Sequence, residues 1–297
     1  MKWQNRRRSG NIEDRRGSSG GGGGRGLPSV GTMMMLWPLI RPLLRSKFGL
    51  MILGVGALAY FSGFNPLSLI GMGSVGNSGP INQAKDDKEA AFMSAVLADT
   101  EDVWTALLPQ YGLHYRAPKM VLYRGSTRSG CGHASAQMGP FYCPVDHKVY
   151  LDLGFFDELA RRHKAGGDFA QAYVLAHEIG HHVQNLQGTL EHVQHLKHQV
   201  RSEAQANRLQ VRVELQADCY AGVWAHHAQK RFKILEPGDI EEALNAASQI
   251  GDDTLQKQAT GTVRPDGFTH GTSRQRVAWF RQGFVKGDLR ACNTFRQ

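Results

Sequence analysis

One short segment, residues 177–181, constrains this chain of 297 residues more than any other feature. It carries His177, Glu178 and His181 within an expected helix over residues 169–187. Helix positions four apart share a face, so the two imidazoles project side by side, as a tetrahedral metal site needs. Glu178 lies between them, where its carboxylate can reach a water on the metal. The motif predicts zinc; the alternative is an amphipathic helix with histidines neighbouring by chance.

A hydrolytic zinc site needs a third protein ligand and leaves a fourth position for water. The best candidate is Glu214, four residues before Asp218 on a helix expected over residues 202–230. One carboxylate can bind the metal while the other accepts the remaining N–H of a ligand histidine. The alternative is an ordinary solvated acidic pair, although small residues surround both acids. These small residues, Gly222 among them, predict close packing against the first helix.

A further histidine, His270, lies in a loop that leads into a helix near residue 276. Zinc-assisted attack on a carbonyl needs a donor for the developing oxyanion, and His270 is our candidate. The alternative is a structural loop histidine. His182 lies about 100° around the helix from His181, so it cannot easily share the same metal.

The net charge of +9 is unevenly distributed along the chain. Residues 1–47 hold ten basic and two acidic side chains, and the remainder is close to neutral. A phosphate-binding groove would need its positive charge in the folded part, so we expect no nucleic-acid partner. Residues 1–47, with many Gly, Ser and Arg residues, are expected to form a disordered cytoplasmic tail.

Residues 48–64 are uncharged and apolar, which is typical of a short transmembrane helix. Basic residues precede this run, so we expect a single-pass protein of the bacterial inner membrane with a cytoplasmic amino terminus. Residues 65–84 form a linker, and a periplasmic or extracellular domain spans 85–297. Two alternatives are a buried core helix and a signal peptide cleaved near Ala57-Leu58-Ala59.

The four cysteines are Cys131, Cys143, Cys219 and Cys292, and none forms a C-x-x-C pair. An even number is compatible with two disulfides, in any of three connectivities, and export would favour them. Buried free thiols are the alternative.

The body is expected to be α+β. Further elements are expected as helices over 86–108 and from about Asp239, and as strands over 119–123 and within 133–153.

Six segments together add a family resemblance. They are Asn11-Ile-Glu-Asp-Arg-Arg-Gly17, Gly139-Pro-Phe-Tyr-Cys-Pro144, Lys148-Val-Tyr-Leu-Asp152, Ala176-His-Glu-Ile-Gly-His-His-Val-Gln184, Glu214-Leu-Gln-Ala-Asp218 and Thr269-His-Gly-Thr-Ser273. In this order they resemble the bacterial family described as putative neutral zinc metallopeptidases. The resemblance implies a membrane-anchored zinc peptidase with a zincin-like fold, acting on a peptide or protein.

By motif match, the resemblance places one zinc ion on His177, His181 and Glu214, and the base on Glu178. Some peptidases with a glutamate as third ligand also carry a Thr-His segment before an Arg-containing helix, which supports His270.

We expect an edge strand near residues 133–143 to border the cleft and pair with an extended substrate. A Cys131–Cys143 disulfide would stiffen this rim, and Cys219–Cys292 would tie the carboxyl-terminal tail to the metal-binding helices. Two rival functions are hydrolysis of a non-peptide amide of the cell wall and a non-catalytic, anchored zinc-binding protein. An intact Glu178 argues against the second, because a binding module needs no base beside its metal.

Overall fold

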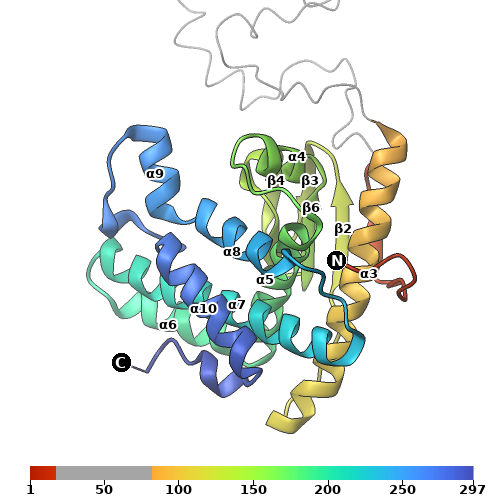
Figure 1. Ribbon diagram of the computed structural model, residues 1–297. Helices are drawn as coiled ribbons and strands as arrows, with labels where there is room; N and C mark the ends of the chain where they lie inside the picture. The colour runs from red at the N-terminus through yellow and green to blue at the C-terminus, as the bar shows by residue number, and fades with distance from the viewer. Residues whose placement is uncertain (18–81, 297) are drawn as a thin grey trace, which may run out of the picture. The chain divides into compact units, whose positions relative to one another are not determined.

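The computed structural model describes residues 1–17 and 82–296, which belong to one compact unit (Figure 1). It is a mixed α+β arrangement, mostly helical. The helices are α3 (Gln83–Leu107), α4 (Gly154–Arg161), α5 (Asp168–Leu186), α6 (Thr189–Gln199), α7 (Glu203–Phe232), α8 (Asp239–Gln249), α9 (Asp252–Thr260) and α10 (Ser273–Lys286), with 3-10 turns η2 (Leu108–Tyr111), η3 (Ala136–Met138), η4 (Pro265–Gly267) and η5 (Leu289–Cys292). The strands are β1 (Ile12–Asp14), β2 (Lys119–Tyr123), β3 (Ser126–Ser129), β4 (Gly132–Ser135), β5 (Phe141–Cys143) and β6 (Lys148–Asp152).

Four strands form the main sheet in the order β1-β2-β6-β5, and β3 pairs with β4 in a separate hairpin. β1, β2 and β6 are parallel, whereas β5 runs antiparallel to β6 at the edge of this sheet. The two central strands alternate sides: Met120 and Leu122 enter the large core, and Val121 enters a second cluster on the other face. The strand over 119–123 and the strand-rich stretch 133–153 were therefore correctly predicted.

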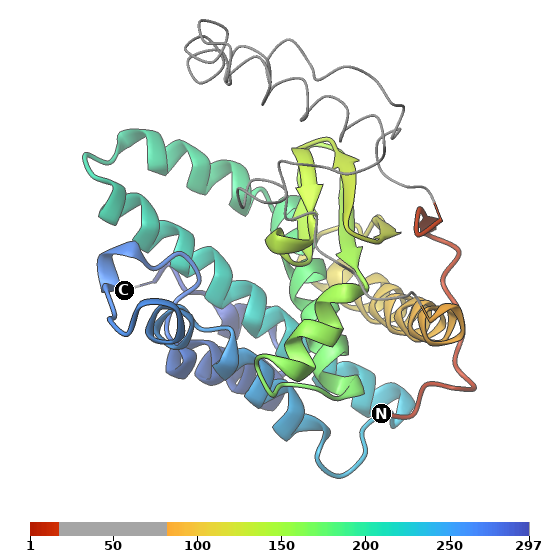
Figure 2. The same cartoon turned by 90° about the horizontal axis from the view of Figure 1, so that it is seen from above.

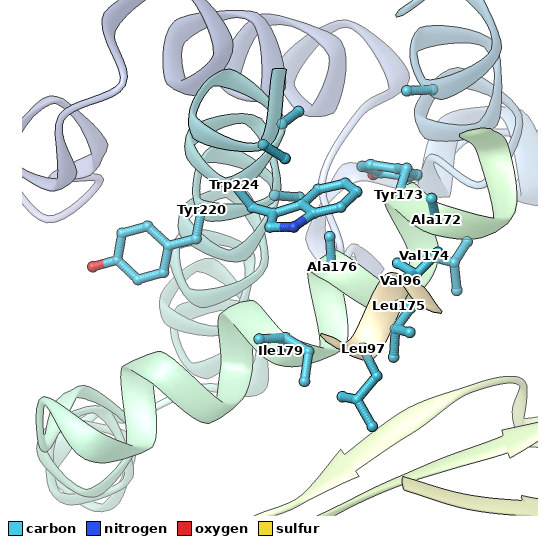
Figure 3. Packing of buried hydrophobic residues seen from close by; sticks show 14 of the residues in the cluster. Val96, Leu97, Ala172, Tyr173, Val174, Leu175, Ala176, Ile179, Tyr220 and Trp224 are labelled. Carbon is cyan, nitrogen blue, oxygen red and sulfur yellow. The ribbon is translucent and has the colours of Figure 1, made fainter. Parts of the chain in front are cut away.

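The main core lies where α3, α5 and α7 meet (Figure 3). Trp224 of α7 is fully buried, and Ala176 and Ile179 of α5 belong to the same cluster. The small size of Gly180 matters here, because a Cβ on it would lie 3.0 Å from the carbonyl oxygen of Ala217. The close approach of the two predicted helices is confirmed at this residue.

The expectation that Gly222 packs against α5 is wrong. A Cβ on Gly222 would lie 2.1 Å from the carbonyl oxygen of Phe280, so this glycine faces α10 rather than α5. Gly283 of α10 is equally constrained, since its Cβ would meet the carbonyl oxygen of Cys219 at 1.9 Å. The small residues of α7 therefore serve two helices, α5 and α10.

The prediction of a disordered tail over residues 1–47 is wrong for residues 1–17. This segment runs alongside α3, and β1 pairs in parallel with β2 (Figures 1 and 2). Two of its arginines, Arg6 and Arg7, are bound by Asp99 and Glu101 of α3. Composition could not reveal these partners, which lie more than ninety residues along the chain.

The apolar run 48–64, the rest of the tail and the linker to residue 81 lie outside the described residues. Within residues 1–17 and 82–296, no helix is both long enough and apolar enough to span a bilayer.

Both expected disulfides are present. Cys131, in the turn of the β3-β4 hairpin, is bonded to Cys143 at the end of β5, with Cα atoms 5.8 Å apart. Cys219 of α7 is bonded to Cys292 of η5, with Cα atoms 5.6 Å apart. The first bridge ties the hairpin to the edge strand, and the second ties the carboxyl-terminal segment to α7.

Candidate metal centre

Three predicted ligand residues meet between α5 and α7. The ligand atoms of His177, His181 and Glu214 all lie within 4.8 Å of one another. The Nε2 atoms of His177 and His181 lie 3.2 and 3.3 Å from the same carboxylate oxygen, Oε2 of Glu214. All three side chains are largely shielded from solvent.

The other nitrogen of each imidazole has a hydrogen-bond acceptor. Nδ1 of His177 donates to Oδ1 of Asp218 at 2.8 Å, and Nδ1 of His181 donates to Oε1 of Gln184 at 2.9 Å. These bonds occupy Nδ1 of both rings and leave the two Nε2 atoms, which meet at the Glu214 oxygen, as the nitrogens available to a metal. Two nitrogens and one carboxylate oxygen form a donor set that fits zinc, with room for further ligands.

Asp218 takes the outer role that its spacing from Glu214 suggested, within a larger buried cluster. Its carboxylate accepts hydrogen bonds from the hydroxyl of Tyr173 at 2.6 Å and from the guanidinium of Arg276 at 2.9 and 3.0 Å. Burial alone would raise the pKa of Asp218, but Arg276 and His177 outweigh it and hold this pKa well below its usual range. Asp218 therefore stays ionised and holds His177 in place.

Gln210 constrains the remaining oxygen of Glu214. Its Nε2 donates to Oε1 of Glu214 at 2.6 Å, and its own Oε1 accepts from the ammonium of Lys197 on α6. With Oε1 occupied, Oε2 is the oxygen presented to a metal. Burial by itself would raise the pKa of Glu214, yet the two imidazoles hold this pKa well below its usual value.

Glu178, which follows His177 in the motif, is buried beside the candidate ligands. Burial raises its pKa above the usual range, although the neighbouring imidazoles and the backbone N–H of Tyr142 oppose this effect. A carboxylate with a raised pKa is a better proton acceptor near neutrality. Glu178 lines the same cavity as the three ligand residues.

This cavity has a volume of about 830 Å³. Its walls come from β5 (Phe141), α6 (Val193) and the segment that contains His270, so the edge strand and the candidate metal ligands share one space. The prediction of an edge strand bordering the cleft is met by β5.

The full length of the chain matches one family. Residues 1–295 match the model of a family described as "Putative neutral zinc metallopeptidase". The chain belongs to this family.

Similar proteins of this metallopeptidase family occur in distant bacteria. "Uncharacterized protein YpfJ" of Escherichia coli K12 is 48% identical over 303 residues, covering 99% of each chain. "Uncharacterized protein Rv2575" of Mycobacterium tuberculosis H37Rv is 46% identical over 203 residues, covering 65% of this chain and 66% of that protein. No solved structure matches the chain.

His270 lines the cavity of this metallopeptidase domain and is held there by Asp252 of α9. Oδ2 of Asp252 accepts the backbone N–H groups of Thr269, His270 and Gly271 at 2.6–2.9 Å. Oδ1 lies 3.3 Å from Nδ1 of His270, so Nε2 is the ring nitrogen available to a ligand. The His270 side chain is 49% exposed.

The sequence reasoning missed several supporting residues: Tyr173, Gln184, Gln210, Asp252 and Arg276. Gln184 lies on the same helix as His177 and His181. Because it follows His181 by three residues, helix spacing could have predicted this contact. Arg276 follows His270 by six residues, but its partner Asp218 is 58 residues away. Only the folded arrangement identifies that pair.

Proposed function

We propose that this chain is a zinc-dependent peptidase in which Glu178 acts as the general base. The observation that carries the proposal is the convergence of two imidazole Nε2 atoms on one Glu214 oxygen, with both Nδ1 atoms already donating elsewhere. Such a pre-oriented set is suited to bind a cation, and the buried carboxylate of Glu178 lies in the same cavity.

Zinc held by these residues would polarise a carbonyl and lower the pKa of a water molecule. Glu178 would accept a proton from the attacking water and return it to the leaving amine. As an imidazolium whose Nδ1 faces Asp252, His270 would donate a hydrogen bond from Nε2 to the developing oxyanion.

The edge strand supports a peptide as the substrate. β5 ends the described sheet and lines the cavity, so its outer edge can pair with an extended peptide through backbone hydrogen bonds. The Cys131–Cys143 disulfide ties this strand to the neighbouring hairpin.

For location, we propose that the peptidase domain lies on the exported side of the bacterial inner membrane. The two disulfides support an oxidising compartment. Membrane attachment through residues 48–64 rests on their apolar sequence.

The decisive test compares the full-length chain with its Glu178→Gln variant on an unfolded protein, with zinc content measured in both. Loss of the general base should slow cleavage by about 10²–10⁴-fold at equal zinc content. Glu191→Gln is the matched control, because Glu191 lines the same cavity on the exposed face of α6. Cleavage that survives in Glu178→Gln would exclude this residue as the base.

The same assay separates the rival functions. If the wild-type chain binds zinc but cuts no unfolded protein, peptide hydrolysis as a general activity is excluded. Cell-wall fragments with non-peptide amides should then be offered, and turnover that depends on Glu178 would identify an amidase.

His270→Ala tests the oxyanion donor. We expect unchanged zinc content and a kcat lower by about 10²–10³-fold, because the interaction forms only in the transition state. His195→Ala on the solvent face of α6 serves as control and should leave turnover unchanged. Equal rates in the two variants would return His270 to a purely structural role.

A further inference from the structure

The amino-terminal segment, residues 1–17, is built into the peptidase domain through its backbone. β1 pairs with β2 from Ile12 against Met120 to Asp14 against Leu122. At the two ends of this pairing, the N–H of Met120 donates to the carbonyl of Asn11 at 2.8 Å, and the N–H of Arg15 donates to that of Leu122 at 2.7 Å. Removing the segment would leave the β2 backbone unpaired along one edge.

Side chains of the segment also neutralise buried acids. Asp99 of α3 is fully buried and accepts two hydrogen bonds from the guanidinium of Arg6. The one from Nε measures 3.0 Å. Glu101 is 8% exposed and accepts from Ser9 at 2.5 Å and Asn11 at 2.8 Å. A buried carboxylate without its partner is strongly destabilising, so the burial of these two acids requires the amino-terminal segment to be bound.

Apolar and aromatic contacts extend the same interface. The Trp3 ring packs edge to face on Phe92 of α3 with centroids 5.3 Å apart, and the Arg6 guanidinium lies 3.8 Å from the centre of the Phe232 ring. The N–H of Lys2 donates to the carbonyl of Ile234 at 2.8 Å. Contacts of this kind span the whole segment, from a strand edge to the end of α7.

We infer that residues 1–17 are a permanent part of the peptidase domain and lie in the same compartment as residues 82–296. The single-pass topology expected from the sequence would place them on opposite sides of a hydrocarbon layer about 30 Å thick. Hydrogen bonds of 2.7–2.8 Å between β1 and β2 are incompatible with that separation. A chain that returns to the compartment it left crosses a bilayer an even number of times, zero included. This inference concerns topology and does not depend on the proposed peptidase activity.

The test is cysteine labelling of the full-length chain in spheroplasts with a membrane-impermeant maleimide. One variant carries Asn5→Cys in the segment, and the other carries Ala259→Cys on α9; both positions are exposed. The parent chain, whose four cysteines are in disulfides, gives the background. Each sample is labelled before and after permeabilisation.

The two variants should behave alike, both labelled from outside or both labelled only after permeabilisation. Labelling of one position from outside with protection of the other would overturn the inference. Cleavage of protein substrates enters neither measurement, so failure here would leave the proposed function untouched.

A second measurement tests docking itself in the purified full-length chain. Arg6→Ala should lower Tm by about 5 °C, because Asp99 then loses its charged partner inside the protein. Arg8→Ala is the matched control, since Arg8 is exposed and its guanidinium lies against the Trp3 ring. Asn11→Ala gives a milder variant should Arg6→Ala fail to fold. If none of these changes exceeds that of Arg8→Ala, the segment is not docked in the protein.

Discussion

Two groups of buried carboxylates are neutralised in different ways in this molecule. Asp218 lies inside the helical core, and its partners His177 and Arg276 are themselves almost fully buried. Asp99, at the amino-terminal interface, is equally inaccessible, but the side chain of its partner Arg6 is 23% exposed. The first group is almost entirely shielded from solvent, whereas the second is open at its cationic end.

The difference determines what each group controls. Coulomb interactions between fully buried charges are weakly screened, so removal of one partner leaves the other in a poor solvent. A partly exposed pair loses less, because water and salt can replace the missing partner. Asp218 also bonds His177, a proposed metal ligand, so we expect its group to link stability to zinc binding, while the Asp99 group bears on folding and topology alone.

The largest effect is expected from Arg276→Met, which leaves Asp218 with less compensation inside the core. The free energy of unfolding of the metal-free chain should fall by about 3–5 kcal/mol, measured by chemical denaturation. Arg274→Met, on the exposed face of the same helix, should stay close to wild type. If Arg276→Met loses no more stability than Arg274→Met, the charge pair around Asp218 does not contribute more to stability than the pair around Asp99.

The double variant Arg276→Met/Asp218→Asn separates stability from metal binding. Neutralising both partners removes the unpaired charge, so more than about 1 kcal/mol of the lost stability should return. The affinity for zinc should remain about 10-fold below wild type, because Nδ1 of His177 no longer donates to a charged acceptor. Competition with a chromophoric chelator measures this affinity. Full recovery of zinc affinity would show that the charge of Asp218 is unimportant to the ligand.

Features set by local spacing were predictable from the sequence. The His177–His181 pair and the Glu214–Asp218 pair each lie four residues apart on a helix, and β2 occupies the predicted residues. Helix spacing was therefore enough to identify residues that the fold brings together in the candidate metal centre. The small residues around Glu214 and Asp218 likewise pointed to the burial of that pair.

Features set by distant partners were not predictable. Arg276 and Asp218 are 58 residues apart, and Arg6 and Asp99 are 93 apart, so no periodicity connects them. The small size of Gly222 was noticed, but its neighbour was assigned to α5 instead of α10. For residues 1–17, low apolar content indicated disorder because composition counts only what a segment can bury by itself. The segment is ordered by its pairing with β2 and by the acidic side chains of α3.

The smallest effect is expected for the outer pair itself, measured by a double-mutant cycle of Arg6→Gln and Asp99→Asn in the full-length chain. Because the Arg6 side chain is 23% exposed, the coupling free energy should be about 1 kcal/mol and should decrease as salt rises from low to high concentration. Urea denaturation of the four chains at two salt concentrations gives the coupling directly. A coupling several times larger and independent of salt would mean that the amino-terminal interface is as dehydrated as the core around Asp218. The distinction between an inner group linked to zinc and an outer group open to water would then no longer hold.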